Sequence, residues 1–220
     1  MDETRVIIST PFYTAYQSPN NRVAIVPSSE ITATDAELSR HPSTAARQED
    51  TEVNHLEVAD EEAKADWKKK LGVLVAKNLI KAAVETDGKT WTGNVARSTL
   101  LSFPRNYELF VKKKGDRHVP RKDYYLYGSQ HVRTFRSPLE FVPHLIWLFQ
   151  GQPLKTDGDP DCSCKYCNSG ATQSEIHKRL LPHAGPSRVR MPVLPDGPKK
   201  SKGAAISVPY KDYTKLNKPS

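Results

Sequence analysis

The sequence has few cysteines and no long apolar run. Its three cysteines all lie between Cys162 and Cys167, which is too few for a paired disulfide framework and favours a reducing, intracellular compartment. No apolar run approaches the roughly 18 residues that a membrane-spanning helix needs. The acidic start, residues 1–5, lacks the apolar core of a signal peptide. We therefore expect a protein that has no membrane partner.

The motifs that usually carry catalysis are also missing. Glycine accounts for 11 of 220 residues, which leaves few tight loops for holding phosphates. The sequence contains no Gly-rich phosphate loop, no nucleophile elbow and no His-Glu-x-x-His pair. Paired carboxylates occur mostly near the start of the chain, where nothing is expected to hold them in a fixed geometry. The sequence thus predicts that the chain is not an enzyme and has no small-molecule substrate.

Charge is unevenly distributed along the chain. Residues 1–66 contain 13 acidic and 5 basic residues, a net charge of −8, whereas residues 67–220 contain 12 acidic and 28 basic residues, a net charge of +16. A strongly basic body attracts polyanions, and nucleic acid is the commonest polyanion in the cell. The alternative interpretation is a basic surface that serves only solubility.

Composition and periodicity divide the chain into five parts. The first part is rich in Ser, Thr, Pro and acidic residues, which bury too little surface to offset the entropy of ordering, although runs 5–9 and 22–26 resemble strands. A helix is expected from Asp60 to about Val84, because apolar residues recur there at steps of three and four. The expected parts are an acidic, mostly disordered tail (1–57), a helix packing on the core (58–90), a central module (91–150), a cysteine cluster (151–181) and a basic disordered tail (182–220).

The central module is expected to be a small α+β fold. Residues 107–111 and 122–127 have the alternation and aromatic content of strands, and a basic loop, 112–116, separates them. Residues 132–135 predict a short third strand. A capping box at 137–140, with Pro at the first helical position, predicts a helix that ends near residue 150. The sequence therefore predicts a three-stranded antiparallel sheet with a packed helix.

This order of elements resembles the methyl-CpG-binding domain over about residues 103–149. The residues that carry the resemblance are Phe103-Pro104-Arg105-Asn106-Tyr107, the Lys-rich loop ending at Gly115, Asp123-Tyr124-Tyr125 and Phe135-Arg136-Ser137. In that family two arginines grip the guanines of the CpG step, while an aspartate and a tyrosine help to hold an arginine and contact the methylated cytosine. The resemblance implies that Arg136 is the second arginine, Asp123 the acid and Tyr125 the tyrosine.

Two positions depart from the family pattern. Lys112 stands at the first arginine, and Asn106 stands where the family usually has glycine. Lysine lacks the planar fork that reads guanine through two hydrogen bonds, so we predict DNA binding without strict methyl-CpG specificity. The alternative is that the tyrosines are core and rim aromatics and the bases form a solvated loop. The residues predicted to contact DNA are Lys112, Lys113, Lys114, Arg121, Lys122, Asp123, Tyr125, Arg133 and Arg136.

A wider pattern resembles the N-terminal region of the fungal cryptic-loci-regulator transcription-silencing proteins. It covers about residues 67–167 and is carried by Trp67-x-x-x-Leu71-Gly72, Phe103-Pro104-x-x-Tyr107, Asp123-Tyr124-Tyr125-Leu126-Tyr127-Gly128, Phe135-Arg136-Ser137-Pro138-x-Glu140-Phe141-x-x-His144-Leu145-x-Trp147-Leu148 and Cys-x-Cys-x-x-Cys. The resemblance implies a nuclear protein of complexes that silence heterochromatin. Full-length members also carry a large bromo-adjacent-homology module, so we expect a short relative or a fragment.

Two functions follow from these features. The first is a nuclear, chromatin-associated module that binds DNA or nucleosomes within a silencing complex. The alternative is a protein-interaction scaffold of such a complex that makes no DNA contact and docks on a partner through the helix at 60–84.

The cysteine cluster predicts a structural zinc knuckle. Cys162, Cys164 and Cys167 offer three soft ligands within six residues, and structural zinc sites use four. The fourth ligand must come from elsewhere, and the candidates are His144, His177 and His183. We favour His144, because it would tie the loop to the preceding helix. The alternative for the cysteines is free thiols in a loop.

Overall fold

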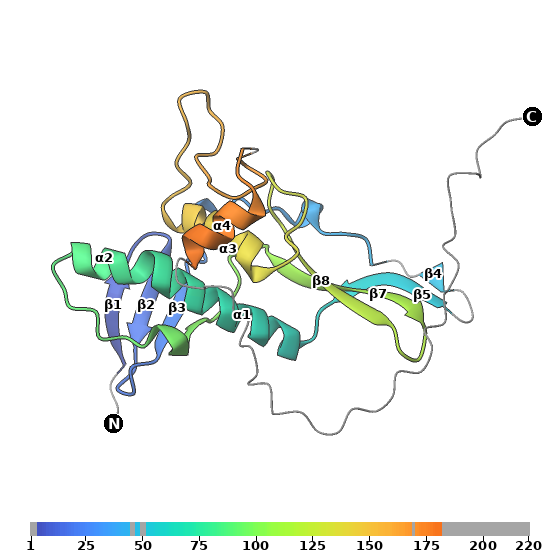
Figure 1. Ribbon diagram of the computed structural model, residues 1–220, viewed down its shortest axis with the longest axis horizontal. Helices are drawn as coiled ribbons and strands as arrows, with labels where there is room; N and C mark the ends of the chain where they lie inside the picture. Colours follow the sequence, from blue (N-terminus) through green and yellow to red (C-terminus); the bar gives the residue numbers. More distant parts are fainter. Residues whose placement is uncertain (1–3, 45–46, 49–51, 169, 182–220) are drawn as a thin grey trace, which may run out of the picture. The chain divides into compact units, whose positions relative to one another are not determined.

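The computed structural model describes residues 4–44, 47–48, 52–168 and 170–181, and the tail predicted at 182–220 lies outside this part. Two four-stranded sheets and a set of helices form the described fold (Figure 1). In the described residues no helix has the length and apolar character needed to cross a membrane. The first sheet has the order β1 (Arg5–Ser9), β2 (Tyr13–Gln17), β3 (Val23–Pro27), β6 (Ser98–Leu100), and the second has the order β4 (Arg47–Gln48), β5 (Glu52–Val58), β7 (Glu108–Asp116), β8 (Arg121–Tyr127).

The first sheet corrects the prediction of a mostly disordered tail at residues 1–57. Strands β1, β2 and β3 are antiparallel, and β6 adds to β3 in parallel. Alternate residues of β2 and β3 are buried, among them Tyr13, Ala15, Val23 and Ile25. The polar average of the segment suggested disorder, but strict alternation supplies one apolar face, and the chain covers that face with helices much later in the sequence.

A nearly continuous helix covers the first sheet and confirms the helix predicted from Asp60. It consists of α1 (Glu61–Val75), a π-helical segment (Ala76–Ile80) and α2 (Lys81–Thr86). Asp60 caps its start by accepting a hydrogen bond from the Ala63 amide at 2.8 Å. Gly88 follows its end with a φ of 72°, a conformation that favours glycine.

The buried stripe of this helix departs from the regular steps of three and four that the sequence predicts. Its large members are Trp67, Leu71, Val75, Ile80 and Val84, which are four apart except for the step of five between Val75 and Ile80. The π-helical segment lies at that step. A wider turn there keeps Ile80 and Val84 on the face that packs on the core, whereas a regular helix would rotate them away.

The second sheet contains the predicted strand pair but a different third strand. β7 and β8 pair in register, and β7 continues through the residues predicted as a basic loop at 112–116. Residues 132–135, predicted as the third strand, make only one bridge, between Phe135 and Leu126. The third strand is β5, from the segment predicted to be disordered, which pairs along the other edge of β7. Local sequence gave no indication of this long-range pairing.

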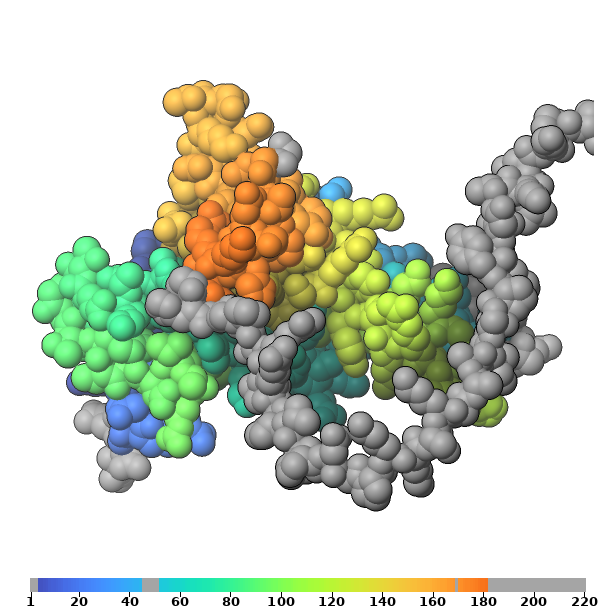
Figure 2. Space-filling model, in the orientation of Figure 1, coloured from blue at the N-terminus to red at the C-terminus, as the bar shows by residue number. Residues whose placement is uncertain are grey.

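Helix α3 (Pro138–Phe149) lies at the centre of the fold, in keeping with its largely apolar sequence. Ser137 caps it by accepting a hydrogen bond from the Glu140 amide, which confirms the predicted start. Phe149 stacks on Tyr13 of the first sheet, and Phe141 contacts Tyr107 just before β7 of the second. The short helix α4 (Gln173–Leu180) packs against α3, and in Figure 2 it lies beside the segment that follows α3.

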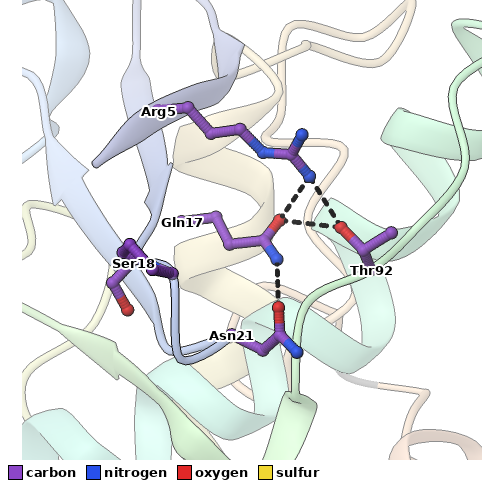
Figure 3. Close-up of a pocket in the computed structure, with 6 residues that line it drawn as sticks. Arg5, Gln17, Ser18, Asn21 and Thr92 are labelled. Atoms are coloured by element: carbon purple, nitrogen blue, oxygen red, sulfur yellow. Dashed lines mark hydrogen bonds between the residues drawn. The ribbon is translucent and has the colours of Figure 1, made fainter. Parts of the chain in front are cut away.

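A hollow at one end of the first sheet is lined by polar side chains that bond to one another (Figure 3). Arg5 donates to the Thr92 hydroxyl at 2.8 Å and to the Gln17 side chain at 3.2 Å. Gln17 in turn donates to Asn21 at 2.8 Å. These bonds tie the segment after α2 to strands β1 and β2, which gives the hollow a structural role.

Candidate metal centre

Four side chains of metal-ligand type converge between α3 and the loop that follows it. His144 lies on α3, and Cys162, Cys164 and Cys167 lie on the loop that follows it. Their ligand atoms all lie within 4.8 Å of one another. The Nδ1 atom of His144 is 3.4, 4.0 and 3.6 Å from the three sulfur atoms in sequence order. His144 is fully buried, so this arrangement is part of the core.

The spacing of these atoms fits a tetrahedral zinc ion. With Zn–S bonds of about 2.3 Å and a Zn–N bond of about 2.0 Å, the nitrogen-to-sulfur edge of a tetrahedron is about 3.5 Å. The three observed distances bracket that value. Three thiolates and one imidazole are also a donor set that structural zinc sites use. The cluster can therefore hold a zinc ion with little rearrangement.

The fourth member of the cluster is His144, the residue favoured from the sequence. His177 lies exposed on α4 and does not belong to the cluster. His183, the third candidate, lies outside the described residues. The cysteines are unpaired and mostly buried, with Cys162 and Cys164 more enclosed than Cys167.

The electrostatics of the cluster favour binding of a cation. The pKa of Cys164 is lowered, because the thiols of Cys162 and Cys167 hydrogen-bond to its sulfur. The pKa of Cys162 is raised by those same bonds, which hold its proton, and by burial. Zinc binds the thiolate form of cysteine, so a metal ion would displace the thiol protons that these bonds hold.

The far side of the His144 ring faces a buried carboxylate. Its Nε2 atom is 3.2 Å from Oδ2 of Asp35, and that oxygen also accepts a hydrogen bond from the Ser129 hydroxyl at 2.6 Å. The other oxygen, Oδ1, accepts a hydrogen bond from the Tyr107 hydroxyl at 2.5 Å. Burial acts to raise the pKa of Asp35, but the bonds from His144, Ser129 and Tyr107 hold that pKa below its ordinary value. Burial acts to lower the pKa of His144, yet its bonds to Asp35 and the cysteines raise it well above its ordinary value.

A second buried carboxylate holds the cysteine loop against α3. Glu140, in the first turn of α3, accepts hydrogen bonds from Lys165 at 2.9 Å, from the Tyr166 hydroxyl at 3.0 Å and from the Arg136 amide at 2.8 Å. Lys165 and Tyr166 lie between Cys164 and Cys167. Although burial acts to raise the pKa of Glu140, these bonds lower it below its ordinary value. Glu140 therefore fixes the loop that carries the sulfur ligands.

Replacing Glu140 by glutamine is expected to lower the free energy of unfolding by about 1–2 kcal/mol near neutral pH, because a charged acceptor is lost. The folded-state pKa of Glu140 lies below its unfolded value, so its contribution is complete above the unfolded pKa and disappears as pH falls through the folded pKa. Urea unfolding of both proteins from pH 7 to pH 3 measures this. A difference between the two proteins that stays constant over that range would contradict the prediction.

The residues predicted to contact DNA do not form one surface. Directly paired residues of β7 and β8 share a face of the sheet, and successive residues alternate between faces. Lys112, Lys114, Arg121, Asp123 and Tyr125 therefore lie on one face. Lys113 and Lys122 lie on the opposite face, where the Lys113 ammonium is 2.6 Å from Glu57. Arg133 and Arg136 are exposed in the segment between β8 and α3.

The pairing of Asp123 differs from what the methyl-CpG resemblance implies. Asp123 forms an ion pair with Arg121, two residues earlier on β8, with an Nε–Oδ2 distance of 2.9 Å. In the described residues no ion pair joins Asp123 to Arg136. Asn106, which replaces the usual glycine, has a φ of 63°. Asparagine tolerates this left-handed conformation better than other non-glycine residues, so the substitution preserves the local backbone.

Sequence reasoning missed the two buried carboxylates of the cluster. Asp35 lies in a segment expected to be disordered, and Glu140 was noted only as a capping residue. The capping signal placed Glu140 correctly at the start of α3, but nothing local indicates that its carboxylate also binds the cysteine loop. Asp35 is 109 positions away from His144 in sequence, so only the folded chain brings them together.

The central part of this chain is similar to a family of known proteins. Residues 99–167 match the family described as "Transcription-silencing protein, cryptic loci regulator Clr2". The curated protein "Cryptic loci regulator 2" of Schizosaccharomyces pombe is 31% identical over 82 residues, which are 37% of this chain and 14% of that protein. The solved "Structure of Clr2 bound to the Clr1 C-terminus" is 21% identical with a TM-score of 0.44, and the match covers 67% of this chain and 31% of the other.

The chain thus matches only a minor part of the length of these two relatives. The matched range runs from β6 through β7, β8 and α3 to Cys167, and it includes all four residues of the metal-ligand cluster. Residues 99–167 are therefore similar to the cryptic-loci-regulator Clr2 transcription-silencing family.

Proposed function

We propose that this chain acts in transcriptional silencing, as a protein-interaction subunit of a nuclear chromatin complex. The observation that carries this proposal is the family match over residues 99–167, because that range builds the centre of the fold. The name of the curated relative, a regulator of cryptic loci, supports the same role and a nuclear location. The chain acts by binding in this proposal, which agrees with the lack of catalytic motifs in its sequence.

The helix that was predicted to dock on a partner offers only its outer face for this purpose. Its apolar stripe is buried within the chain, where α1 packs on β6 and α3. Toward solvent it presents lysines, with Val73 and Leu74 in a shallow hollow beside Lys69 and Lys70. The helix therefore has no free apolar stripe for a partner.

The outer edge of β8 is the better place for a partner segment. β8 is the last strand of its sheet, and Leu126 directs its amide and carbonyl outward to Phe135. Because backbone direction alternates along a strand, Lys122 and Tyr124 also direct theirs outward. In the described residues these groups have no backbone partner. An extended segment can pair with such an edge.

The groove beside this edge indicates the chemistry of the segment. It is lined by Trp67 and Tyr124 and by three acidic residues from the start of α1, Asp60, Glu62 and Asp66. Two lysines, Lys70 and Lys122, also line the groove, and Lys70 forms an ion pair with Asp66 at 2.6 Å. The acidic residues outnumber these lysines. Glu62 has no ion pair in the part of the chain that the structure describes. A segment with basic side chains complements this wall.

DNA binding is a second proposed function, and one observation favours it. Lys112, Lys114 and Arg121 lie on one face of the β7–β8 pair, and Arg40 and Arg133 line a hollow at Tyr127, on that same face. Clustered bases of this kind contact phosphates without reading sequence. Lys113 and Lys122 lie on the opposite face of the sheet, so a duplex bound to this face would not contact them.

A crossed experiment separates the two functions. The full chain is titrated with the C-terminal segment of a Clr1-type subunit and, separately, with a short DNA duplex over a salt series. We expect Glu62→Lys to weaken segment binding at least about tenfold through charge repulsion in the groove. Lys112→Glu with Lys114→Glu should leave segment binding unchanged and, if DNA binds, weaken that binding and reduce its salt dependence.

Matched controls keep the outcomes distinct. The control for Glu62→Lys is Glu85→Lys, which makes the same charge change on exposed α2. The control for the double substitution in β7 is Lys68→Glu with Lys69→Glu, on the polar face of α1. Absence of segment binding by the unaltered chain would contradict the interaction proposal with this partner. DNA affinity that is unchanged by the β7 substitutions, or absent at low salt, would remove the second function.

A further inference from the structure

The environment of Asp35 points to a role in the metal centre that the sequence gave no reason to expect. Its side chain is 2% exposed, and the His144 ring beside it is fully buried. The two oxygens of Asp35 are engaged by Tyr107, Ser129 and His144. Of these three partners, only His144 belongs to the metal-ligand cluster, so it is the candidate ligand that Asp35 orients directly.

The two nitrogens of His144 have separate partners. Nδ1 faces the three sulfur atoms, while Nε2 faces Asp35 at 3.2 Å and Ser129 at 3.4 Å. A histidine that binds zinc through one nitrogen commonly donates its other N–H to a carboxylate, which fixes the tautomer and makes the metal-binding nitrogen more basic. The geometry here leaves Nδ1 as the ligand atom and Nε2–H as the donor to Asp35.

Asp35 lies on a segment that docks on the matched domain from outside it. The family match begins at residue 99, yet the Glu37 amide donates to the Gly128 carbonyl at 3.0 Å and the Gln130 amide donates to the Asp35 carbonyl at 3.1 Å. Side chains add to this fastening, because the Asn106 amide group donates to the Ala36 carbonyl at 3.2 Å.

The same segment is fastened at both ends. The Thr34 hydroxyl donates to the Arg105 carbonyl at 3.0 Å, and the His41 ring is 2.8 Å from the Asn106 carbonyl. Residues 34–41 thus lie along the turns at 105–107 and 128–130, and these are the turns that carry Tyr107 and Ser129. The segment, the two turns and the His144 ring form one hydrogen-bonded unit.

We propose that Asp35 is the positioning residue of the metal centre, and that docking of residues 34–41 and metal binding at His144 and the three cysteines strengthen each other. This inference rests on the cluster binding zinc. Coupling of two binding events is reciprocal, so the metal stabilises the docked segment by the same factor by which the docked segment tightens metal binding. The domain matched at 99–167 is then incomplete without a piece of chain that lies before it.

Zinc affinity of the full chain tests the first half of the proposal. Competition with a chromogenic chelator should show zinc binding 10–100-fold weaker in Asp35→Asn than in the unaltered protein, the range typical of lost outer-shell partners. Glu30→Gln is the control, because it makes a similar change from carboxylate to amide at an exposed position just before the docked segment. Cobalt(II) substituted for zinc should show altered absorption bands in Asp35→Asn, which a purely structural role for Asp35 would leave unchanged.

Hydrogen exchange of the unaltered protein tests the other half without any substitution. Removal of zinc by a chelator should speed exchange of the Glu37 and Gln130 amides by at least about tenfold, while the paired amides of β2 and β3 keep their protection. Equal zinc affinity and equal cobalt spectra in Asp35→Asn would overturn the proposal, as would unchanged exchange after zinc removal. An unaltered protein that binds no zinc would overturn the metal centre itself, and the silencing proposal would stand independently.

Discussion

Replacing Cys164 by serine is expected to abolish tight zinc binding and to lower the melting temperature by more than about 10 °C. Cys164 is fully buried in the cluster, and its sulfur lies 4.0 Å from His144 Nδ1 and accepts a hydrogen bond from the Cys167 amide at 3.3 Å. Structural zinc sites contribute on the order of 10 kcal/mol to folding in small peptides, so losing one of four ligands removes several kcal/mol. The serine hydroxyl is a poor zinc ligand and leaves a buried polar group without its metal.

Zinc content measured by mass spectrometry, together with a thermal unfolding curve, tests this expectation. Ser163→Ala is the matched control, because Ser163 lies in the same loop and its side chain is not part of the cluster. The control should retain about one zinc ion per chain. Unchanged zinc content and melting temperature in Cys164→Ser would show that the cysteines are free thiols, which is the alternative that the sequence left open.

Replacing Gly72 by alanine is expected to destabilise the fold by about 3 kcal/mol, which lowers the melting temperature by about 6–12 °C in a chain of this size. A Cβ atom at Gly72 would lie 2.3 Å from the Cα and 2.4 Å from the carbonyl carbon of Thr99 in β6. These are backbone atoms of a strand held in the sheet, so they cannot move aside as a flexible side chain can. Alanine would therefore push α1 away from the first sheet.

Chemical denaturation of the two proteins measures this effect, and Gly170→Ala is the control. A Cβ at Gly170 meets nothing closer than 3.5 Å, so that change should alter the free energy of unfolding by less than about 0.5 kcal/mol. If Gly72→Ala were as stable as the unaltered protein, α1 would not approach β6 as closely as described. The glycine of the Trp67-x-x-x-Leu71-Gly72 pattern thus has a packing reason, since only glycine permits this approach.

Prediction from the sequence was accurate where the signal is local. Apolar residues recurring at steps of three and four after Asp60 indicated the long helix, and Ser137 with Glu140 indicated the start of α3. Periodicity and capping depend on residues three or four positions apart, so the sequence displays them directly. The choice of His144 for the cysteine cluster also succeeded, because a ligand on a rigid helix next to the loop is near in both sequence and space.

Prediction failed where distant segments pair. Strand β5 and the first sheet come from residues whose average composition resembles disorder, yet their alternate residues are buried against partners elsewhere in the chain. Residues 112–114 were expected in a loop but lie in β7, where Lys113 is on the opposite face from Lys112 and Lys114, because a strand places successive side chains on opposite faces. A loop would not have separated them.

By itself, the sequence determined the helices, the β7–β8 pair, the donor types of the metal-ligand cluster and the likeness to a silencing family. Only the tertiary structure decided which carboxylates support that cluster, because Asp35 lies 72 positions from Tyr107, 94 from Ser129 and 109 from His144. Contacts over such distances depend on how whole strands and turns pack, and no local pattern of residues encodes that packing. The N-terminal segment therefore changed from an expected tail into part of the core that surrounds the candidate metal centre.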